Sequence, residues 1–246
     1  MKMALVCHVM SRVLIFASLL APVVTRAAPE QPPDVCLSWS VGLDEKGTIT
    51  SLEAVNPEYM PALQTRLEPA IRTWHFTTGK INGQPAPTQT TLTLNLGFEP
   101  ASDGDYRVRL RSLGTGPTYG HVVQPRYGDF ALKAHRGGAV MLKVDYDAGG
   151  RITSATPVEG GSPKPTIDLI QSATIAVKKW TFKPERIAGH GVPGRALVPV
   201  CFSISARQQR SCLWKRDGED KPLDSDRPIA LSSVVGIDTN LVGSTL

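Results

Sequence analysis

Residues able to do chemistry are present in this chain, but they lack the spacing that catalysis or metal binding needs. The segment Asp145–Gly149 resembles the start of a calcium loop, yet no carboxylate follows at the closing position. No serine or cysteine lies in a nucleophile motif, and no paired carboxylates suggest acid–base catalysis. Four of the five histidines are scattered without metal-ligand spacing, at His75, His121, His135 and His190. We therefore expect no enzyme, with no catalytic residue, no cofactor and no metal site.

Cysteine is the other reactive residue type, and its placement favours one disulfide. No two cysteines have the Cys-x-x-Cys spacing of a zinc or redox site. Alternation along a strand directs Cys201 away from the core that Val200 and Phe202 enter. Cys212 follows 11 residues later, so we predict a Cys201–Cys212 bridge. A bridge from Cys36 is the competing possibility, and it would clamp two distant parts of the chain together.

The N-terminal segment predicts export from the cytoplasm. Lys2 and Arg12 precede an apolar run at Val13–Val24, and Thr25–Ala27 provides small residues for cleavage, as is typical of a secretory signal peptide. The run is shorter than the ~20 apolar residues that span a bilayer. We predict a signal peptide over residues 1–27, with retention as a membrane anchor as the alternative. Cleavage lowers the formal net charge from +5 to +2, which does not indicate a nucleic-acid partner.

The rest of the chain contains an internal repeat. The composition of the whole chain is globular, and its 22 glycines and 20 prolines favour short strands joined by turns. Similar segments recur in the same order at offsets of 103 and then 106 residues, which chance rarely produces. The pairs are Ser38–Ser51 with Met141–Ser154, Trp74–Phe76 with Trp180–Phe182, and Leu92–Phe98 with Val198–Ile204.

Each copy predicts a β-β-α-β unit, most clearly in the second. β-Branched and aromatic residues over Val140–Asp147 favour a strand, and Asp147–Gly150 supplies the glycines of a tight hairpin before a return strand. Apolar residues from Leu169 to Trp180 recur at helical spacing, and Val198–Ile204 alternates as a third strand. The predicted fold class is therefore α+β, with two tandem modules that each pack a small antiparallel sheet against a helix.

These boundaries divide the chain into five predicted parts. The two modules are separated by a segment that is either a linker or an extra strand, and a tail with equal numbers of basic and acidic residues follows the second module. The parts are the signal peptide 1–27, a degenerate first module 28–100, the linker or strand 101–123, the second module 124–205 and the tail 206–246.

The second module resembles the carboxy-terminal domain of the TonB family of energy transducers, over about Pro125–Ser205. Gly128 departs from the pattern, because the family usually has proline there. The first module resembles a degenerate copy that lacks the Pro-x-Tyr lead-in. The resemblance depends on an ordered set of motif residues, namely Pro125, Tyr127, Trp180, Phe182 and Pro184.

The resemblance implies a periplasmic protein that recognises an extended peptide, such as a segment of an outer-membrane receptor, in receptor-dependent transport. In that family the last strand pairs with the peptide, because an exposed sheet edge offers unpaired N–H and C=O groups. Pro199 lacks an N–H and limits the registers open to a partner. The predicted pairing edge comprises Ala196, Leu197, Val198, Val200, Cys201, Phe202, Ser203 and Ile204.

Two other functions stay open. An uncleaved N-terminal segment would make the protein a membrane-anchored transducer, although the chain lacks the long proline-rich spacer that such proteins use to cross the periplasm. The second alternative is a structural envelope protein, whose modules pack together or form a homodimer and whose tail covers the sheet edge. In every case the expected partner is a protein or peptide of the cell envelope, and membrane contact requires the uncleaved segment.

Overall fold

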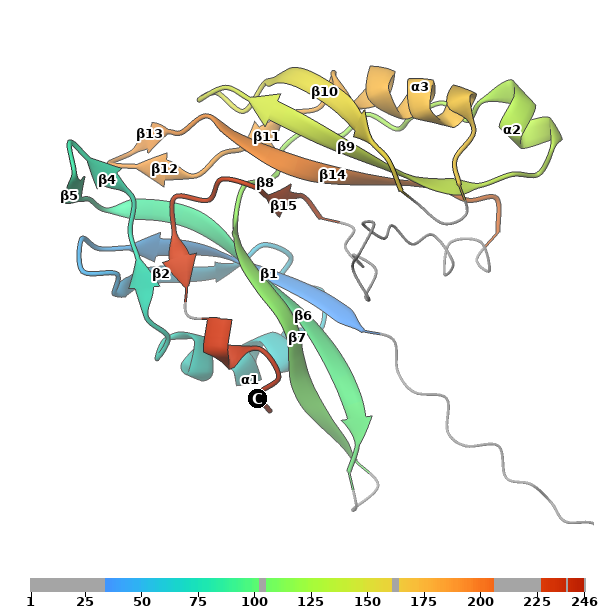
Figure 1. The fold of residues 1–246 in the computed structure, drawn as a ribbon. Coiled ribbons are helices and arrows are strands. Elements are labelled where there is room, and N and C mark those ends of the chain that lie inside the picture. Colours follow the sequence, from blue (N-terminus) through green and yellow to red (C-terminus); the bar gives the residue numbers. More distant parts are fainter. Residues whose placement is uncertain (1–33, 102–104, 161–163, 206–226, 238, 246) are drawn as a thin grey trace, which may run out of the picture. The chain divides into compact units, whose positions relative to one another are not determined.

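The fold is described by a computed structural model over residues 34–101, 105–160, 164–205, 227–237 and 239–245. The predicted signal peptide, Cys212 and the first part of the predicted tail lie outside the described residues. Strands are mostly antiparallel and helices are few among the residues described, which confirms the α+β class (Figure 1).

The first half builds an antiparallel sheet around a leucine-rich core. β1 pairs with β2 on one side and with β6 on the other, and β7 pairs with the far side of β6. Trp39 on β1 and Leu94 on β6 are fully buried, and Ile71 of α1 closes the same core. The elements are β1 (Val35–Leu43), β2 (Ile49–Ala54), α1 (Pro61–Ile71), β3 (Phe76–Thr77), β4 (Lys80–Ile81), β5 (Gln84–Pro85), β6 (Thr88–Pro100) and β7 (Tyr106–Gly116).

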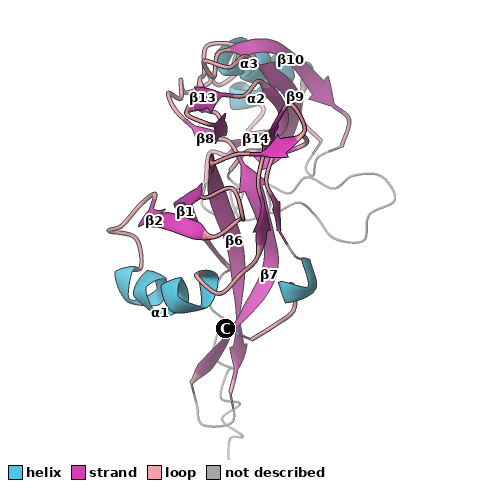
Figure 2. Ribbon diagram, turned by 90° about the vertical axis from the view of Figure 1, so that its left-hand side faces the viewer, coloured by secondary structure: helices cyan, strands magenta, loops and turns pink. Residues whose placement is uncertain are grey.

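The β6–β7 hairpin continues past the rest of its sheet. β1 pairs with β6 only as far as Leu96, whereas β7 pairs with β6 as far as Pro100. Figure 2 shows this extension as a two-stranded arm. Glu99 on the arm forms ion pairs with Arg109 at 3.0 Å and Arg111 at 3.3 Å, all three being well exposed. Exposed ion pairs of this kind contribute ~0–1 kcal/mol, so the arm depends on its backbone ladder.

The second half repeats the same order of elements behind a short lead-in. β9 is the central strand, with β10 on one side and β14 on the other, and α3 covers the core face of this sheet. Leu169, Ala173 and Val177 form the buried stripe of α3, at the spacing that the sequence predicts. The elements are β8 (Thr118–Tyr119), α2 (Asp129–Lys133), β9 (Gly138–Tyr146), β10 (Ile152–Val158), α3 (Ile167–Val177), β11 (Phe182–Lys183), β12 (Arg186–Ile187), β13 (His190–Gly191) and β14 (Gly194–Phe202).

The first hairpin has the same construction in both halves. Asp44 Oδ1 accepts N–H bonds from Lys46 and Thr48, both at 2.8 Å, and Asp147 Oδ1 accepts equivalent bonds from residues 149 and 151, both at 2.9 Å. Gly47 and Gly150 follow with φ near +80°, where a Cβ would also collide with a backbone carbonyl. The N–H bonds hold the pKa of Asp44 below its usual value.

Strand pairing also joins the two halves. The β12–β13 hairpin adds to the first-half sheet, where Arg186 lies opposite Gln89 and Ile187 opposite Thr88. The resulting strand order is β13-β12-β6-β1-β2, with β7 on β6. The sequence does not predict this link, which makes the halves share one sheet rather than stand as separate modules.

The last described residues cross from the second half to the first. β15 (Ile229–Ala230) pairs with β14, and β16 (Gly236–Ile237) pairs with β3. Val235 between them is 4% exposed and belongs to the first-half core. A 3-10 helix, η1 (Thr239–Leu241), leads to Ser244, whose carbonyl accepts the N–H of Leu110 at 3.1 Å. The part of the predicted tail from Val235 onward is therefore an integral part of the first half.

Candidate functional site

The predicted pairing edge is the outer edge of β14. On its inner side β14 pairs with β9 over nine residue pairs, from Gly194 opposite Tyr146 to Phe202 opposite Gly138. On its outer side, strand pairing between described residues occurs only with β15, at Ala196 and Leu197. β14 is thus the last long strand of its sheet, and a two-residue strand lies beside it.

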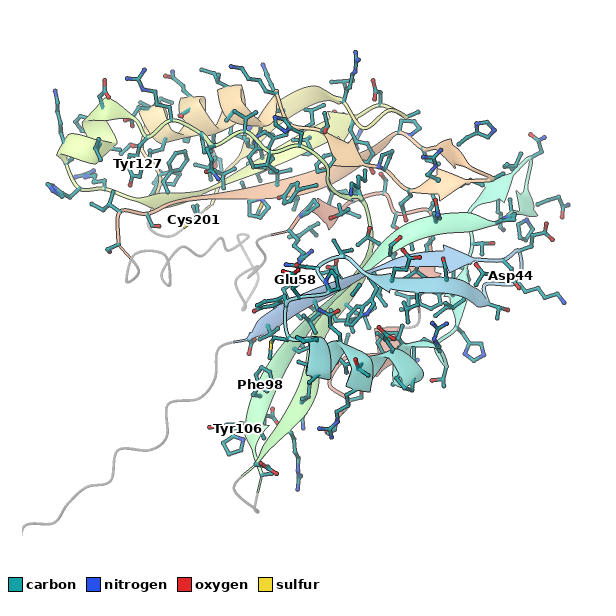
Figure 3. All side chains as sticks on the ribbon, turned by 180° about the vertical axis from the view of Figure 1, so that it is seen from behind. Asp44, Glu58, Phe98, Tyr106, Tyr127 and Cys201 are labelled. Carbon is teal, nitrogen blue, oxygen red and sulfur yellow. The ribbon has the colours of Figure 1, made fainter. Side chains whose placement is uncertain are left out.

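The predicted edge residues present their side chains to two different faces. Leu197 lies on the face away from the helices, in a small apolar cluster with Ala139 and Met141, and Ile229 packs against this cluster. Cys201 is exposed, and Figure 3 shows it on the side of β14 away from Tyr127. Ser203 is half-buried and Ile204 is exposed just beyond the strand. The residues that enter the second-half core are Ala196, Val198, Val200 and Phe202.

The backbone of β14 directs alternate residues toward the outer edge. Arg195 donates its N–H to Ser232 Oγ at 2.9 Å, and its carbonyl accepts the N–H of Leu231 at 2.8 Å. Because N–H and C=O groups alternate in direction along a strand, residues 197, 199 and 201 face the same way. Pro199 has no N–H to offer there, so the edge lacks one donor in its middle, as the sequence predicts.

A buried carboxylate fixes the tail where it leaves β14. Glu185 is 2% exposed, and its Oε1 accepts hydroxyl bonds from Thr90 at 2.6 Å and Ser233 at 2.9 Å. Its Oε2 accepts the N–H of Val234 at 2.9 Å. Burying a carboxylate is costly unless hydrogen bonds compensate, and here three donors come from two segments, β6 and the tail. Glu185 therefore ties the second half to β6 and to the tail.

The same carboxylate influences a neighbouring tyrosine. Burial raises the pKa of Tyr146 to about 12, and the negative charge of Glu185 raises it further in the same direction. Tyr146 lies at the end of β9 opposite Gly194, and its ring packs edge-on against Phe182 with centroids 5.0 Å apart. The tyrosine hydroxyl thus stays neutral over the whole physiological pH range.

The motif residues hold the lead-in against the second-half core. Trp180 is 6% exposed, and its Nε1 donates to the carbonyl of Val123 at 2.7 Å. Tyr127 packs edge-on against Phe202 and donates its hydroxyl to the carbonyl of Arg136 at 2.8 Å. Burial raises the pKa of Tyr127, with a further rise from the charge of Asp168. These contacts give Trp180 and Tyr127 a structural role.

Phe182 and Pro184 complete the motif at the hairpin between β9 and β10. The N–H of Phe182 donates to the carbonyl of Gly150 at 2.7 Å, and the ring of Phe182 stacks on Tyr119. Pro184 lies close to Gly150, where a Cβ would come within 3.2 Å of its ring. Pro125 is half-buried in the lead-in. The motif therefore positions β14 and its neighbours, and none of its members reaches the outer edge by the contacts described.

Gly128, the departure from the family pattern, has a physical reason. A Cβ at this position would lie 2.0 Å from Asp168 Oδ2, so proline or any other residue would displace the carboxylate. Asp168 Oδ2 accepts the N–H of Ala131 at 3.1 Å and so satisfies the start of α2. The hydroxyl of Thr166 also donates to Asp168, and these bonds hold its pKa below its usual value.

A groove of about 420 Å³ lies between this lead-in and α3. Its charged lining mixes both signs, with Arg126 and Lys179 beside Asp129 and Asp168. Apolar Val123 and Ile175 line the same groove, so its chemistry favours no single class of ligand.

Three further expectations concern cysteines, metals and membranes. The predicted Cys201–Cys212 bridge stays a prediction, because Cys212 lies outside the described residues. Within the described ranges, no cluster of three or more His, Cys, Asp or Glu side chains is placed to bind a metal ion. None of the helices in those ranges is both long and apolar enough to span a membrane.

The elements from the lead-in to β14 define a small domain in which helices cover a three-stranded antiparallel sheet. Residues 123–204 match the family described as Gram-negative bacterial TonB protein C-terminal. The chain is also similar to the "Protein TonB" of two strains of Xanthomonas campestris pv. campestris. Each is 33% identical over 81 residues, which is 33% of this chain and 35% of the relative's length.

Sequence reasoning missed two residues that shape this site. Glu185 follows the motif residue Pro184, but nothing local marks it as buried, because its donors lie 95 and 48 residues away. For Asp168, the absence of the family's proline at Gly128 is a usable signal, because the Asp168 carboxylate lies where a Cβ at residue 128 would be. The predicted edge residues lie on and just beyond β14, between β9 and β15 in the sheet, and their pairing with a peptide stays a prediction.

Proposed function

We propose that this chain is a non-enzymatic, TonB-like protein of the periplasm that recognises an extended peptide by strand addition to β14. The observation that supports it is the outer edge of β14, which ends the part of the chain that matches the TonB C-terminal family and is paired by β15 at only two of its nine residues. The family resemblance makes a periplasmic segment of an outer-membrane receptor the expected partner, and receptor-dependent transport the expected process. Side-chain alternation would leave the core intact during pairing, because core residues and backbone edge groups point in different directions.

The first half is, in our proposal, a diverged second copy of the same domain. It lies outside the matched residues, but it has the same element order, the same Asp-and-glycine hairpin and the same apolar final strand. Its last strand, β6, is paired by β7 over ten residue pairs. The proposal therefore assigns peptide recognition to the second half and a supporting role to the first.

The pairing of β15 with β14 favours one competing function, a structural envelope protein with a covered edge. In that case the tail would be a permanent part of the sheet and no partner would pair there. The two functions make opposite predictions for a peptide titration.

The test is an NMR titration of the protein with synthetic peptides from the periplasmic N-terminal segments of outer-membrane receptors. Strand addition predicts that amide shifts cluster on Ala196–Ile204, with far smaller changes on β2 and β10. A matched peptide with alternate N-methylated residues keeps every side chain but loses the N–H donors of one edge, so it should not bind. Equal binding by the N-methylated peptide, or no shift on β14 with any peptide, would overturn the proposal.

A further inference from the structure

The tail segment beside β14 consists of two parts that are held very differently. Residues 227–232, here called the strap, contact β14 through two strand pairs and through the bonds of Leu231 and Ser232 to Arg195. Leu231 is 44% exposed, and Ile229 is only half-buried. No strap residue is among the fully buried residues of the part of the chain that the structure describes.

Residues 233–237, here called the anchor segment, are held by core packing and by a buried carboxylate. Ser233 and Val234 donate to Glu185, and Val235 is 4% exposed in the first-half core. Gly236 and Ile237 then pair with β3, and the N–H of Gly236 also donates to Thr77 at 3.0 Å. Removing the anchor segment would therefore open the first-half core, whereas removing the strap would not.

We propose that the strap is an internal ligand of the β14 edge, which a partner peptide displaces while the anchor segment stays bound. This inference depends on the proposed function and adds its regulation and its specificity. Glu185 marks the boundary, because it bonds the first two residues of the anchor segment and is itself locked to Thr90. The released strap stays tethered at a high local concentration, so only a peptide that pairs better than the strap opens the site.

The strap also shows which peptide chemistry the edge accepts. Ile229 places an apolar side chain on the cluster of Leu197 and Met141. Ala230 lies against Gly116, where a Cβ added to Gly116 would come within 2.5 Å of the Ala230 Cβ, so we infer that this close approach favours a small residue at the place of Ala230. Leu231 contributes its N–H while its side chain is largely exposed, and Ser232 accepts the N–H of Arg195 through its hydroxyl.

The ligand class that follows is an extended, antiparallel peptide with the pattern apolar, small, any residue, hydroxyl. An aliphatic residue would occupy the place of Ile229, alanine, glycine or serine the place of Ala230, and serine or threonine the place of Ser232. A bulky residue at the second position would collide with the β7 end of the first half, so the first half acts as a steric filter on the ligand.

The experiment compares Leu231→Pro with Leu231→Ala in the full chain. The proline removes the N–H that bonds to Arg195, whereas the alanine keeps it, and both remove the same exposed side chain. The probe is a fluorescent synthetic peptide with the sequence of residues 227–234, followed by anisotropy. We expect at least ~10-fold tighter binding by the proline variant than by the alanine variant, because the internal competitor is weakened. The same peptide with valine in place of alanine at the second pattern position should bind at least ~10-fold more weakly.

Hydrogen exchange separates failure of this inference from failure of the proposed function. The Leu197 amide should exchange faster in the proline variant than in the alanine variant, while the Ile237 amide stays protected in both and reports an intact fold. Equal exchange of the Leu197 amide and equal peptide affinity in the two variants would overturn the proposal that the strap is a displaceable internal ligand. Faster Leu197 exchange without binding of any receptor peptide or strap peptide would uphold a releasable strap and overturn peptide recognition.

Discussion

The outer edges of β6 and β14 occupy the same place in the two halves, yet they are closed in different ways. β7 pairs with β6 over ten residue pairs and brings Leu110, which is fully buried, and Val108 into the core. β15 pairs with β14 over two residue pairs and adds only the half-buried Ile229 to a three-residue cluster. β7 thus has both a long backbone ladder and buried apolar side chains, whereas β15 has little of either, so we expect β15 to open more readily than β7.

This difference assigns separate tasks to the halves. In the first half, β7 pairs with the outer edge of β6, so that edge is closed. The first half also holds the anchor segment of the tail, through the bond of Thr90 on β6 to Glu185 and through the β3–β16 pairing. The second half keeps a long last strand beside the short strand β15, which we propose to be exchangeable. A tandem arrangement is useful under this account, because one copy recognises a peptide and the other holds the competitor in place.

The largest expected effect separates the two added strands by stability. Leu110→Ala should lower the free energy of unfolding by about 2–5 kcal/mol, because it leaves a cavity in a closed core. Ile229→Ala should lower it by about 1 kcal/mol or less, because the side chain is half-buried on an outer face. Denaturant unfolding of both variants measures the contrast. Equal losses would mean that β15 is as integral to the fold as β7.

The next effect concerns the link between the halves. Glu185→Ala should lower the free energy of unfolding by about 3 kcal/mol, because the donors on Thr90, Ser233 and Val234 lose their buried acceptor. Glu53→Ala on the exposed face of β2 is the matched control and should change stability little. Thermal unfolding of the two variants provides the comparison. A Glu185→Ala variant as stable as the control would contradict the claim that the carboxylate holds the second half to β6 and the tail.

A smaller effect is expected at the lead-in, which only the second half possesses. Gly128→Ala should cost about 1 kcal/mol, because the new Cβ displaces the Asp168 carboxylate from the start of α2. The lowered pKa of Asp168 means that its contribution is present above the unfolded pKa and is lost as pH falls through the folded pKa. Acid unfolding should therefore differ between wild type and Asp168→Asn above that range and converge below it. Parallel profiles at every pH would contradict this assignment.

The smallest effect is spectroscopic. Glu185→Gln should lower the pKa of Tyr146 from about 12, because it removes a negative charge that disfavours ionisation of the tyrosine hydroxyl. The value should stay above the ordinary tyrosine value, since burial is the larger cause. Because the folded pKa is raised, the neutral hydroxyl stabilises the fold below about pH 10, and this is lost as pH rises through about 12. Titration of tyrosinate absorbance measures the pKa shift. An unchanged titration curve would mean that the charge of Glu185 does not affect the pKa of Tyr146.

Local patterns predicted much of the second half correctly. Gly150 indicates a hairpin, and the apolar stripe from Leu169 to Val177 indicates a helix. The alternation around Val200 indicates a final strand. Each of these signals spans only a few neighbouring residues, which is why sequence alone carries them.

The strands and contacts that close the outer edges of β6 and β14 have no comparable local pattern in the sequence. Glu185, Thr90 and Ser233 come together from three distant segments, and their residue types are ordinary surface types until the fold buries them. Ile229 and Ala230 form too short a strand to show a period. The strap is therefore recognisable only in the three-dimensional structure, whereas the sequence indicates no more than a tail that covers the edge as one alternative.

Native-state hydrogen exchange of the unmodified chain tests the central claim most directly. The account predicts that the Leu231 amide, which bonds to Arg195, opens in a local event at least ~10-fold more often than amides within the β6–β7 ladder, a difference of about 1.4 kcal/mol. The Leu231 amide should then respond little to mild denaturant, while the ladder amides open with global unfolding. If the Leu231 amide and the ladder amides open together with the same denaturant dependence, the β14 edge is closed as permanently as the β6 edge and the account is wrong.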